Sequence, residues 1–257
     1  MGLSKEREGL IGRLKVRRTR EREGLFLVEG IRSTDEALSS GAKLKFAVVS
    51  PRLGALRGGG ALKVRLARAR IDTVEVTDDE LAALSDTEAP QGVLAVCPEA
   101  SHDIGGLPHG GVLVLDGVQD PGNVGTLIRA AAAFGLAGVV ALDGTVDPYN
   151  PKAVRAAAGA IFRARVVRAR WTDAEQPLRA RGPILLADMG GKDVASLSPS
   201  SDWSLVIGSE GAGPRAAVRD VASERIGVPM PGGAESLNAG VAGAILLYVL
   251  TRESPRV

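Results

Sequence analysis

The sequence predicts an α/β protein of two domains, and three observations support this fold class. Short apolar segments alternate with helical segments along the whole chain of 257 residues. The apolar segments of the second half are nearly continuous, which is typical of a parallel sheet covered by helices on both faces. Between the halves, 98–111 reads PEASHDIGGLPHGG, a composition typical of a linker. We therefore expect a first domain at 1–98, a linker at 99–110 and a second domain at 111–257.

The first half reads as a small α/β unit whose strands are buried by helices. Strands are expected at 26–28, 46–49, 73–76 and 93–96. Helices are expected at 6–18, across 34–38, at 61–70, and from Asp78 or Asp79 to Leu84.

The second half alternates more clearly. Strands are expected at 112–115, 138–142, 165–167, 184–187, 205–207 and 226–228, and helices at 123–134, 151–160, 174–181 and 239–248. Ligands of parallel sheets bind at the carboxyl ends of the strands. Three polar or glycine-rich loops follow strands here, at 116–123, 208–213 and 229–238. The sequence therefore predicts a ligand site where these loops meet.

The last expected helix, 239–248, is apolar on every face and directly follows the Pro/Gly-rich loop. Such a helix is expected to be buried all round, in a core or against a partner. Asn238 can cap this helix, or it can hydrogen-bond within the loop.

Charge is concentrated in the first half, although the net charge is only +2. Residues 1–22 hold eight Lys or Arg and three Glu, and residues 57–70 hold five Lys or Arg and no acid. Either run alone is equally consistent with a solvated surface, but two runs in one half favour a polyanion partner. The aromatic content of 3% argues against an aromatic platform for single-stranded nucleic acid.

Several other classes of protein are disfavoured. The lone Cys97 excludes a disulfide framework and a cysteine zinc site, and its apolar surroundings predict inert core. His102 and His109 lie in the linker without helical i, i+4 spacing, so no metal site is expected. The charged N-terminus and the absence of a long apolar run predict no signal peptide and no membrane span. We expect a soluble, cytoplasmic protein.

The first two loops are each ambiguous alone. In DGVQDPGNVGTLIR, Asn123 and Arg129 are six residues apart and do not share a helix face by i+4 spacing. Asn123 at the helix start can still point into the same cleft as Arg129; the alternative is an N-cap and a surface charge. IGSEGAGP has three glycines around Glu210, but it lacks the dinucleotide fingerprint and the Gly-Lys-Ser/Thr of a P-loop. Glu210 would repel phosphate and would suit a cationic or hydroxyl-bearing ligand; a tight turn with a solvated charge is the alternative.

Three segments, taken together and in this order, form a pattern that is specific enough to identify a family. DPGNVGTLIRAA, IGSEGAGP and VPMPGGAESLNAGVAGAILLY resemble the three motifs of the SpoU (TrmH-like) RNA ribose 2′-O-methyltransferases of the SPOUT superfamily. EGLFLVEGIRSTDEAL and LSDTEAPQGVLAV are similar to the L30e-like substrate-binding domain of that family. The resemblance covers nearly the whole chain. It departs from the family pattern at Pro231 and at Ala234-Glu235 in the third loop.

The resemblance implies an N-terminal L30e-like RNA-binding domain and a C-terminal SPOUT domain with a deep trefoil knot. It implies S-adenosylmethionine (AdoMet) as cofactor, no metal, and a homodimer formed through the knot region. Simple core is an equally good reading of the helix that would form that interface. By position, the implied cofactor contacts are Gly208, Ser209, Val228, Met230 and Leu237. The implied catalytic residues are Asn123, Arg129, Glu210, Ser236 and Asn238.

The implied chemistry needs little from the protein beyond placement, because a sulfonium methyl group is already activated. Arg129 is the residue that the resemblance places at the ribose hydroxyl. Because arginine does not lose its proton in proteins, we expect it to hold the adjacent phosphate and to stabilise the developing alkoxide rather than to act as a base.

The expected substrate is structured RNA, most simply 23S rRNA or a ribosomal precursor, since an appended first domain is more typical of the rRNA-acting members. Its expected RNA contacts are Arg13, Lys15, Arg17, Arg18 and Arg20. Two alternatives stay open at this point: a tRNA ribose methyltransferase, and a non-catalytic RNA-binding or ribosome-assembly protein of the same fold.

Overall fold

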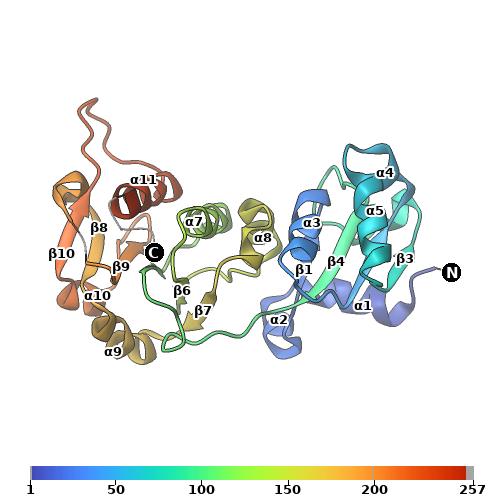
Figure 1. The fold of residues 1–257 in the computed structure, drawn as a ribbon, viewed down its shortest axis with the longest axis horizontal. Coiled ribbons are helices and arrows are strands. Elements are labelled where there is room, and N and C mark those ends of the chain that lie inside the picture. Colours follow the sequence, from blue (N-terminus) through green and yellow to red (C-terminus); the bar gives the residue numbers. More distant parts are fainter. Residues whose placement is uncertain (1, 199, 253–257) are drawn as a thin grey trace. The chain divides into compact units, whose positions relative to one another are not determined.

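The computed structural model describes residues 2–198 and 200–252, and the chain forms two compact units (Figure 1). The first unit comprises residues 1–99 together with Tyr149–Arg163; the second comprises 100–148 and the remainder of the chain from Ala164. The division differs from the expected domains at two places. Residues 100–110, expected to be a linker, belong to the second unit, and Ile104 and Leu107 are part of its core. Tyr149–Arg163 lies between two strands of the second unit in sequence, yet it groups with the first.

The first unit is built on a four-stranded mixed sheet in the order β1-β4-β2-β3. Strand β4 (Val93–Pro98) pairs antiparallel with β1 (Leu25–Glu29) and with β2 (Phe46–Val49), and β2 pairs parallel with β3 (Thr73–Glu75). The helices are α1 (Lys5–Leu14), α2 (Arg17–Glu23), α3 (Ile31–Ser39), α4 (Pro51–Ala55), α5 (Gly59–Arg68) and α6 (Asp78–Leu84). All four predicted strands are confirmed.

The expected helix at 6–18 is instead two helices. Val16 has an extended backbone, which ends α1 before α2 begins. Arg20, on α2, is 1% exposed and donates from its guanidinium to the carbonyls of Leu14 (2.8 Å) and Lys15 (2.9 Å). These carbonyls stand at the C-terminal end of α1, where helix carbonyls lack partners. The prediction that Arg20 faces RNA is therefore wrong: its guanidinium is buried and holds the α1–α2 junction together.

The segment Tyr149–Arg163 packs on the first unit through aromatic and charged contacts. It contains α8 (Pro151–Ala157) and the short 3₁₀ helix η1 (Ala160–Phe162). The ring of Phe26, on β1, lies 4.8 Å from that of Tyr149 and 5.7 Å from that of Phe162, centroid to centroid. Arg163 donates from Nε to Glu36 at 2.6 Å. This segment thus contributes to the core and the surface of the first unit.

The second unit is built on a six-stranded sheet in the order β10-β8-β9-β5-β6-β7. Every pairing is parallel, which confirms the predicted parallel sheet. The strands are β5 (Gly111–Asp116), β6 (Gly138–Leu142), β7 (Val166–Ala169), β8 (Ile184–Asp193), β9 (Trp203–Gly208) and β10 (Glu224–Gly227). The helices are α7 (Pro121–Ala133), α9 (Trp171–Arg181), α10 (Ala216–Val221) and α11 (Ala239–Arg252), with a 3₁₀ turn η2 (Val194–Ser196).

Helices cover both faces of this sheet. Val112 and Val114 of β5 share one apolar cluster with Ala174 and Leu178 of α9. Successive strand residues point to opposite faces, and on the other face a Cβ added at Gly243 of α11 would lie 2.3 Å from Leu127 of α7 and 3.5 Å from Ile207 of β9. The two helices therefore approach closely where glycine leaves room.

Helix α11 is only partly buried within this chain. Gly243, Leu246 and Leu247 are buried, but Val241 is 47% exposed and Tyr248 is 55% exposed. Residues at i and i+7 lie on one helix face, so the chain leaves one apolar stripe of α11 uncovered instead of burying the helix all round. No described helix is long and apolar enough to span a membrane.

Replacing Arg20 with Ala is expected to lower the free energy of unfolding by about 2–4 kcal/mol, because buried carbonyls at the end of α1 lose their donors and a cavity is left. Urea denaturation followed by circular dichroism measures this. Arg18→Ala, on an exposed neighbour of the same helix, is the matched control and should remain close to the wild type. Equal stability of the two variants would contradict the structural role of Arg20.

Candidate active site

A cavity of 580 Å³ lies in the second unit, and the second and third motif loops form much of its wall. Its lining comes from the ends of β8, β9 and β10, from the loops that follow β9 and β10, and from the first turns of α11. All five residues expected to contact a cofactor line it: Gly208, Ser209, Val228, Met230 and Leu237. In Figure 1 the loop between β10 and α11 projects from the body of this unit. The volume is that of a small-molecule site.

The loop after β9 folds back on itself tightly. Ser209 and Gly213 exchange two backbone hydrogen bonds of 3.2 and 2.9 Å, and the Ser209 hydroxyl accepts from the backbone N–H of Ala212. A Cβ added at Gly208 would lie 2.2 Å from the backbone nitrogen of Pro214. The loop can therefore close only over glycine at 208, and this closure leaves its backbone along the cavity wall.

The motif loops are joined by a hydrogen bond between Asn123 and Glu210. Asn123 Nδ2 donates to Glu210 Oε1 at 2.7 Å, and the Asn123 side chain is nearly buried. The N-cap of α7 is Asp120, whose carboxylate accepts from the backbone N–H of Asn123. Asn123 is therefore not the cap of its helix, and its amide is available to fix the Glu210 carboxylate.

Asn238 is the cap of α11. Its side-chain oxygen accepts from the backbone N–H groups of Gly240 (3.0 Å) and Val241 (3.2 Å). A Cβ added at Gly240 would lie 3.2 Å from the side-chain oxygens of both Asn123 and Asn238. The structure thus brings Asn123, Glu210 and Asn238 together, and Glu210, Ser236 and Asn238 all line the cavity.

Arg129 is not part of this group. It lies exposed on α7, outside the cavity lining, and makes no hydrogen bond or ion pair with the described part of the chain. Its guanidinium is therefore available to a group from outside the chain.

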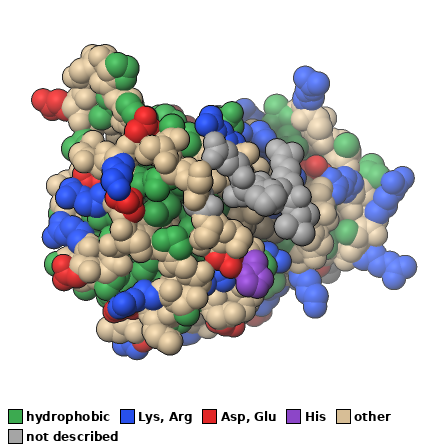
Figure 2. All heavy atoms as spheres, turned by 60° about the vertical axis from the view of Figure 1, so that its left-hand side comes forward, with side chains coloured by type: hydrophobic (Ala, Val, Ile, Leu, Met, Phe, Trp, Pro, Cys, Tyr) green, Lys and Arg blue, Asp and Glu red, His purple; other side chains and the backbone are tan. Residues whose placement is uncertain are grey.

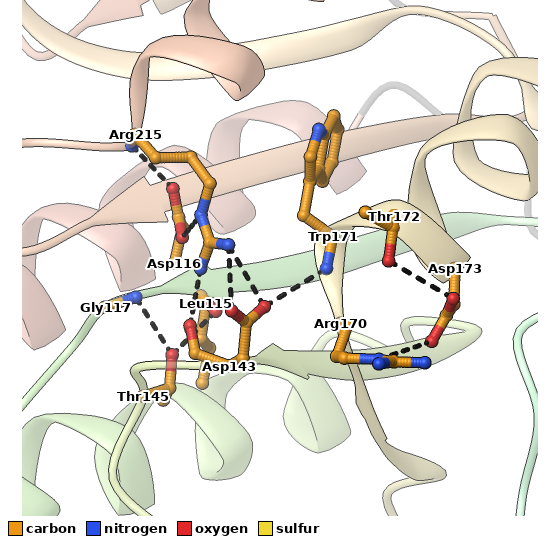
Figure 3. Close-up of polar contacts among 10 residues, drawn as sticks. All are labelled: Leu115, Asp116, Gly117, Asp143, Thr145, Arg170, Trp171, Thr172, Asp173 and Arg215. Atoms are coloured by element: carbon orange, nitrogen blue, oxygen red, sulfur yellow. Dashed lines mark hydrogen bonds and ion pairs between the residues drawn. The ribbon is translucent and has the colours of Figure 1, made fainter.

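An ion pair between the buried Asp116 and the half-buried Arg215 fixes the far end of the loop after β9 (Figure 3). Asp116, the last residue of β5, is 2% exposed and accepts from the backbone N–H and the Nε of Arg215, both at 2.7 Å. The Arg215 guanidinium also contacts Asp143, which follows β6, at 3.0 Å. Arg215 thereby ties the loop to two adjacent strand ends. The sequence analysis assigned no role to any of these three residues.

The charges of this network support one another. Partial burial raises the pKa of Asp143, but hydrogen bonds from the Trp171 backbone N–H and from Arg215 outweigh it and hold the pKa below its usual value. Burial lowers the pKa of Arg215, and the carboxylates of Asp116 and Asp143 more than restore it. Both groups are therefore ionised across the neutral range.

The sequence analysis also missed the wall formed by β8, because that strand extends to Asp193 rather than ending at 187. Asp188 and Met189 line the cavity. Hydrogen bonding to Arg225 lowers the pKa of Asp188, against the opposing effect of partial burial. The cavity therefore has an ionised carboxylate on this wall.

Only some of the side chains expected to contact RNA in the first unit are without an ion-pair partner. Arg13 and Arg18 are exposed, whereas Lys15 pairs with Asp86 at 2.8 Å and Arg17 with Glu21 at 2.8 Å. Figure 2 shows Lys and Arg side chains projecting from the visible part of this unit.

Asp116→Ala is expected to destabilise the protein by about 2–4 kcal/mol, somewhat less than a fully buried pair would, because Arg215 retains partial contact with water. Asp173→Ala is the control: Asp173 pairs with Arg170 at 3.1 Å, but both side chains are exposed (Figure 3), and such pairs contribute little. Thermal unfolding compares the two variants. A loss as small for Asp116→Ala as for Asp173→Ala would show that the Arg215 network does not hold the loop.

Two family models match the chain. The SpoU rRNA Methylase family matches residues 111–248, and the MRM3-like substrate binding domain matches residues 10–95. The chain is 35% identical to the 23S rRNA (guanosine(2553)-2′-O)-methyltransferase RlmP of Bacillus subtilis, over 93% of each chain. It is 32% identical to the 23S rRNA (uridine(2479)-2′-O)-methyltransferase of Streptomyces viridochromogenes, over 92% of this chain and 86% of that one.

Solved structures of similar methyltransferases match the fold of this chain. The SpoU methyltransferase AviRb from Streptomyces viridochromogenes, in complex with AdoMet, matches with a TM-score of 0.85 at 29% identity, over 97% of this chain and 98% of that one. The AdoMet-bound rRNA methyltransferase from Sinorhizobium meliloti matches with a TM-score of 0.84 at 26% identity, over 98% and 96%. With the motif loops arranged as described, these matches identify the chain as a member of the SpoU rRNA methylase family.

Proposed function

We propose that this protein transfers a methyl group from AdoMet to the 2′-hydroxyl of a ribose in RNA, and that its substrate is 23S rRNA. The observation that carries the proposal is the cavity: the five residues expected to contact the cofactor line one 580 Å³ space. The AdoMet-bound relatives and the relatives named as 23S rRNA methyltransferases support the cofactor and the substrate. The expected cytoplasmic location and trefoil knot stay predictions.

The cavity suits AdoMet in size and in chemistry. Its walls combine apolar side chains, such as Val228, Met230 and Leu237, with backbone groups of the loop after Gly208. Because a Cβ at Gly208 would meet Pro214, the loop forms a cradle from main chain rather than from side chains. The Glu210 carboxylate would favour a cofactor with cationic groups, whereas the charge of Asp188 is already compensated by Arg225.

Bound AdoMet would supply an activated methyl group, and the protein's task would be to place and polarise the ribose. Asn123 holds the Glu210 carboxylate in one orientation through its 2.7 Å hydrogen bond. Arg129 retains its proton, so we assign it to the phosphate beside the target ribose and to the negative charge that develops on the ribose oxygen. Ser236 and Asn238 would position the hydroxyl at the cavity rim, with Asn238 held by its cap bonds to α11.

RNA binding would use the first unit. Arg13, Lys15, Arg17 and Arg18 remain the proposed contacts; Arg20 is removed from the set because it is buried. Lys15 and Arg17 would first have to leave their partners, Asp86 and Glu21. The segment Tyr149–Arg163 packs on this unit, so deleting residues 1–96 would uncover it, and point substitutions are the cleaner test.

We further propose a homodimer in which the uncovered stripe of α11 is buried. Val241, Ile245 and Tyr248 are spaced by four and three residues and share this stripe, and the Tyr248 ring contacts Phe134 of α7 at 5.9 Å between centroids. A partner surface on this stripe would remove the exposed apolar side chains from water.

Arg129→Lys is expected to lower methyl transfer to 23S rRNA at least about 100-fold, because an ammonium cannot replace the fork of the guanidinium at phosphate and alkoxide. Transfer of tritiated methyl groups to in vitro transcribed 23S rRNA and to total tRNA measures both activity and substrate class. AdoMet affinity, measured by calorimetry, should stay at the wild-type value. Near wild-type turnover of Arg129→Lys would contradict the role assigned to Arg129, and methylation of tRNA alone would contradict the rRNA assignment.

Val241→Glu combined with Tyr248→Glu is expected to convert a dimer to monomers, because it would bury two charges in the proposed interface. Sedimentation velocity measures the change in mass. Val64→Glu is the control, since Val64 is 50% exposed on α5 of the first unit. A wild-type protein that is monomeric at all concentrations would contradict the proposed dimer.

A further inference from the structure

The first unit contains a second polar cavity, of 230 Å³, that is separate from the candidate active site. It lies among the end of β1, the start of α3, the loop before β4 and helix α8. Its polar lining residues are Glu29, Arg32, Ser33, Thr87, Gln91 and Arg155, and Ala89 also lines it.

Arg155 leaves one donor unsatisfied at this cavity. Its NH1 group is buried and has no hydrogen-bond partner in the described part of the chain. NH1 forms an ion pair with the Glu29 carboxylate, whose Oε2 lies 3.5 Å away. The other oxygen of Glu29 already accepts from the hydroxyls of Ser85 and Thr87. Arg155 NH1 is thus held by a long ion pair rather than by a hydrogen bond, and it keeps the capacity to donate to a further acceptor.

Two further donors stand at the same cavity. Arg32 is exposed and makes no hydrogen bond or ion pair with the described residues. The Gln91 side-chain oxygen accepts from the backbone N–H of Ile31 at 2.9 Å, which fixes the amide and leaves its NH₂ group unbonded within the described chain. With two guanidiniums against one carboxylate, the lining carries a net positive charge and favours an anion.

We propose that this cavity receives one unpaired nucleotide of the RNA substrate. Its volume of 230 Å³ is below that of a typical small-molecule site, so it suits one unit of a longer chain. Arg155 contacts the phosphate, Arg32 stacks on the base, and the Gln91 NH₂ group donates to the base edge. Unpaired RNA nucleotides are recognised through such stacking and edge contacts. This inference rests on the proposed function and identifies where the first unit would bind a nucleotide of the RNA.

Two variants test the cavity in different ways. Ala89→Trp fills it without changing charge, and the exposed position of Ala89 tolerates the larger side chain. Arg155→Gln removes the unsatisfied guanidinium. Each is expected to weaken binding of in vitro transcribed 23S rRNA at least about tenfold in a filter assay, the scale of one lost base contact. Arg155→Gln should also reduce the slope of log affinity against log salt by about one unit, whereas Ala89→Trp should not.

The control is Arg219→Gln, which removes one charge from an exposed arginine of α10 that has no partner among the described residues. It measures the general effect of one charge on RNA affinity. Circular dichroism checks folding, and AdoMet calorimetry checks the second unit in each variant.

The outcomes separate the two proposals. A wild-type protein that neither binds AdoMet nor transfers methyl groups would refute the proposed function. A wild-type protein that does both, with Ala89→Trp and Arg155→Gln binding the transcript as tightly as Arg219→Gln, would refute only the cavity assignment. Binding of free mononucleotides in the cavity with unchanged RNA affinity in both variants would also overturn it, because the occupant would then be a free nucleotide.

Discussion

The ion pair between the buried Asp116 and the half-buried Arg215 is the interaction on which the candidate site depends. A parallel sheet brings the carboxyl ends of its strands to one edge, but the loops that follow could take many shapes. Arg215 removes that freedom after β9, since it joins its loop to the ends of β5 and β6. Glu210, earlier in the same loop, is held by Asn123. A loop fixed at both points keeps its backbone along the cavity before any ligand arrives, which lowers the entropic cost of binding.

Much of the fold could be predicted because burial leaves a clear pattern in the sequence. All strands of the parallel sheet were located from apolar runs, and β6 was placed to the residue. Two features left no such pattern. The break between α1 and α2 is held by hydrogen bonds from the Arg20 side chain to carbonyls at the end of α1, but in sequence Arg20 reads as a surface charge in a basic run. The packing of Tyr149–Arg163 on the first unit depends on aromatic contacts with Phe26, far away in the chain.

The candidate site was predictable where residues act through the main chain or at a fixed place in a motif. Gly208 and Asn238 are examples, since a close approach and a helix cap both leave local signals. Asp116 and Arg215 were missed because an ion pair between residues 99 positions apart leaves no periodic or local signal. Asp188 was missed because β8 continues beyond its apolar core into residues that read as a loop.

Calorimetric titration with AdoMet tests whether the closed loop at Gly208 forms a wall of an AdoMet site. Gly208→Ala forces a Cβ against Pro214, while Gly60→Ala, on α5 of the first unit, meets nothing within 4 Å. We expect AdoMet to bind the wild type and Gly60→Ala equally well, and to bind Gly208→Ala at least about tenfold more weakly. Equal affinity of Gly208→Ala and Gly60→Ala, or no binding by the wild type, would contradict it.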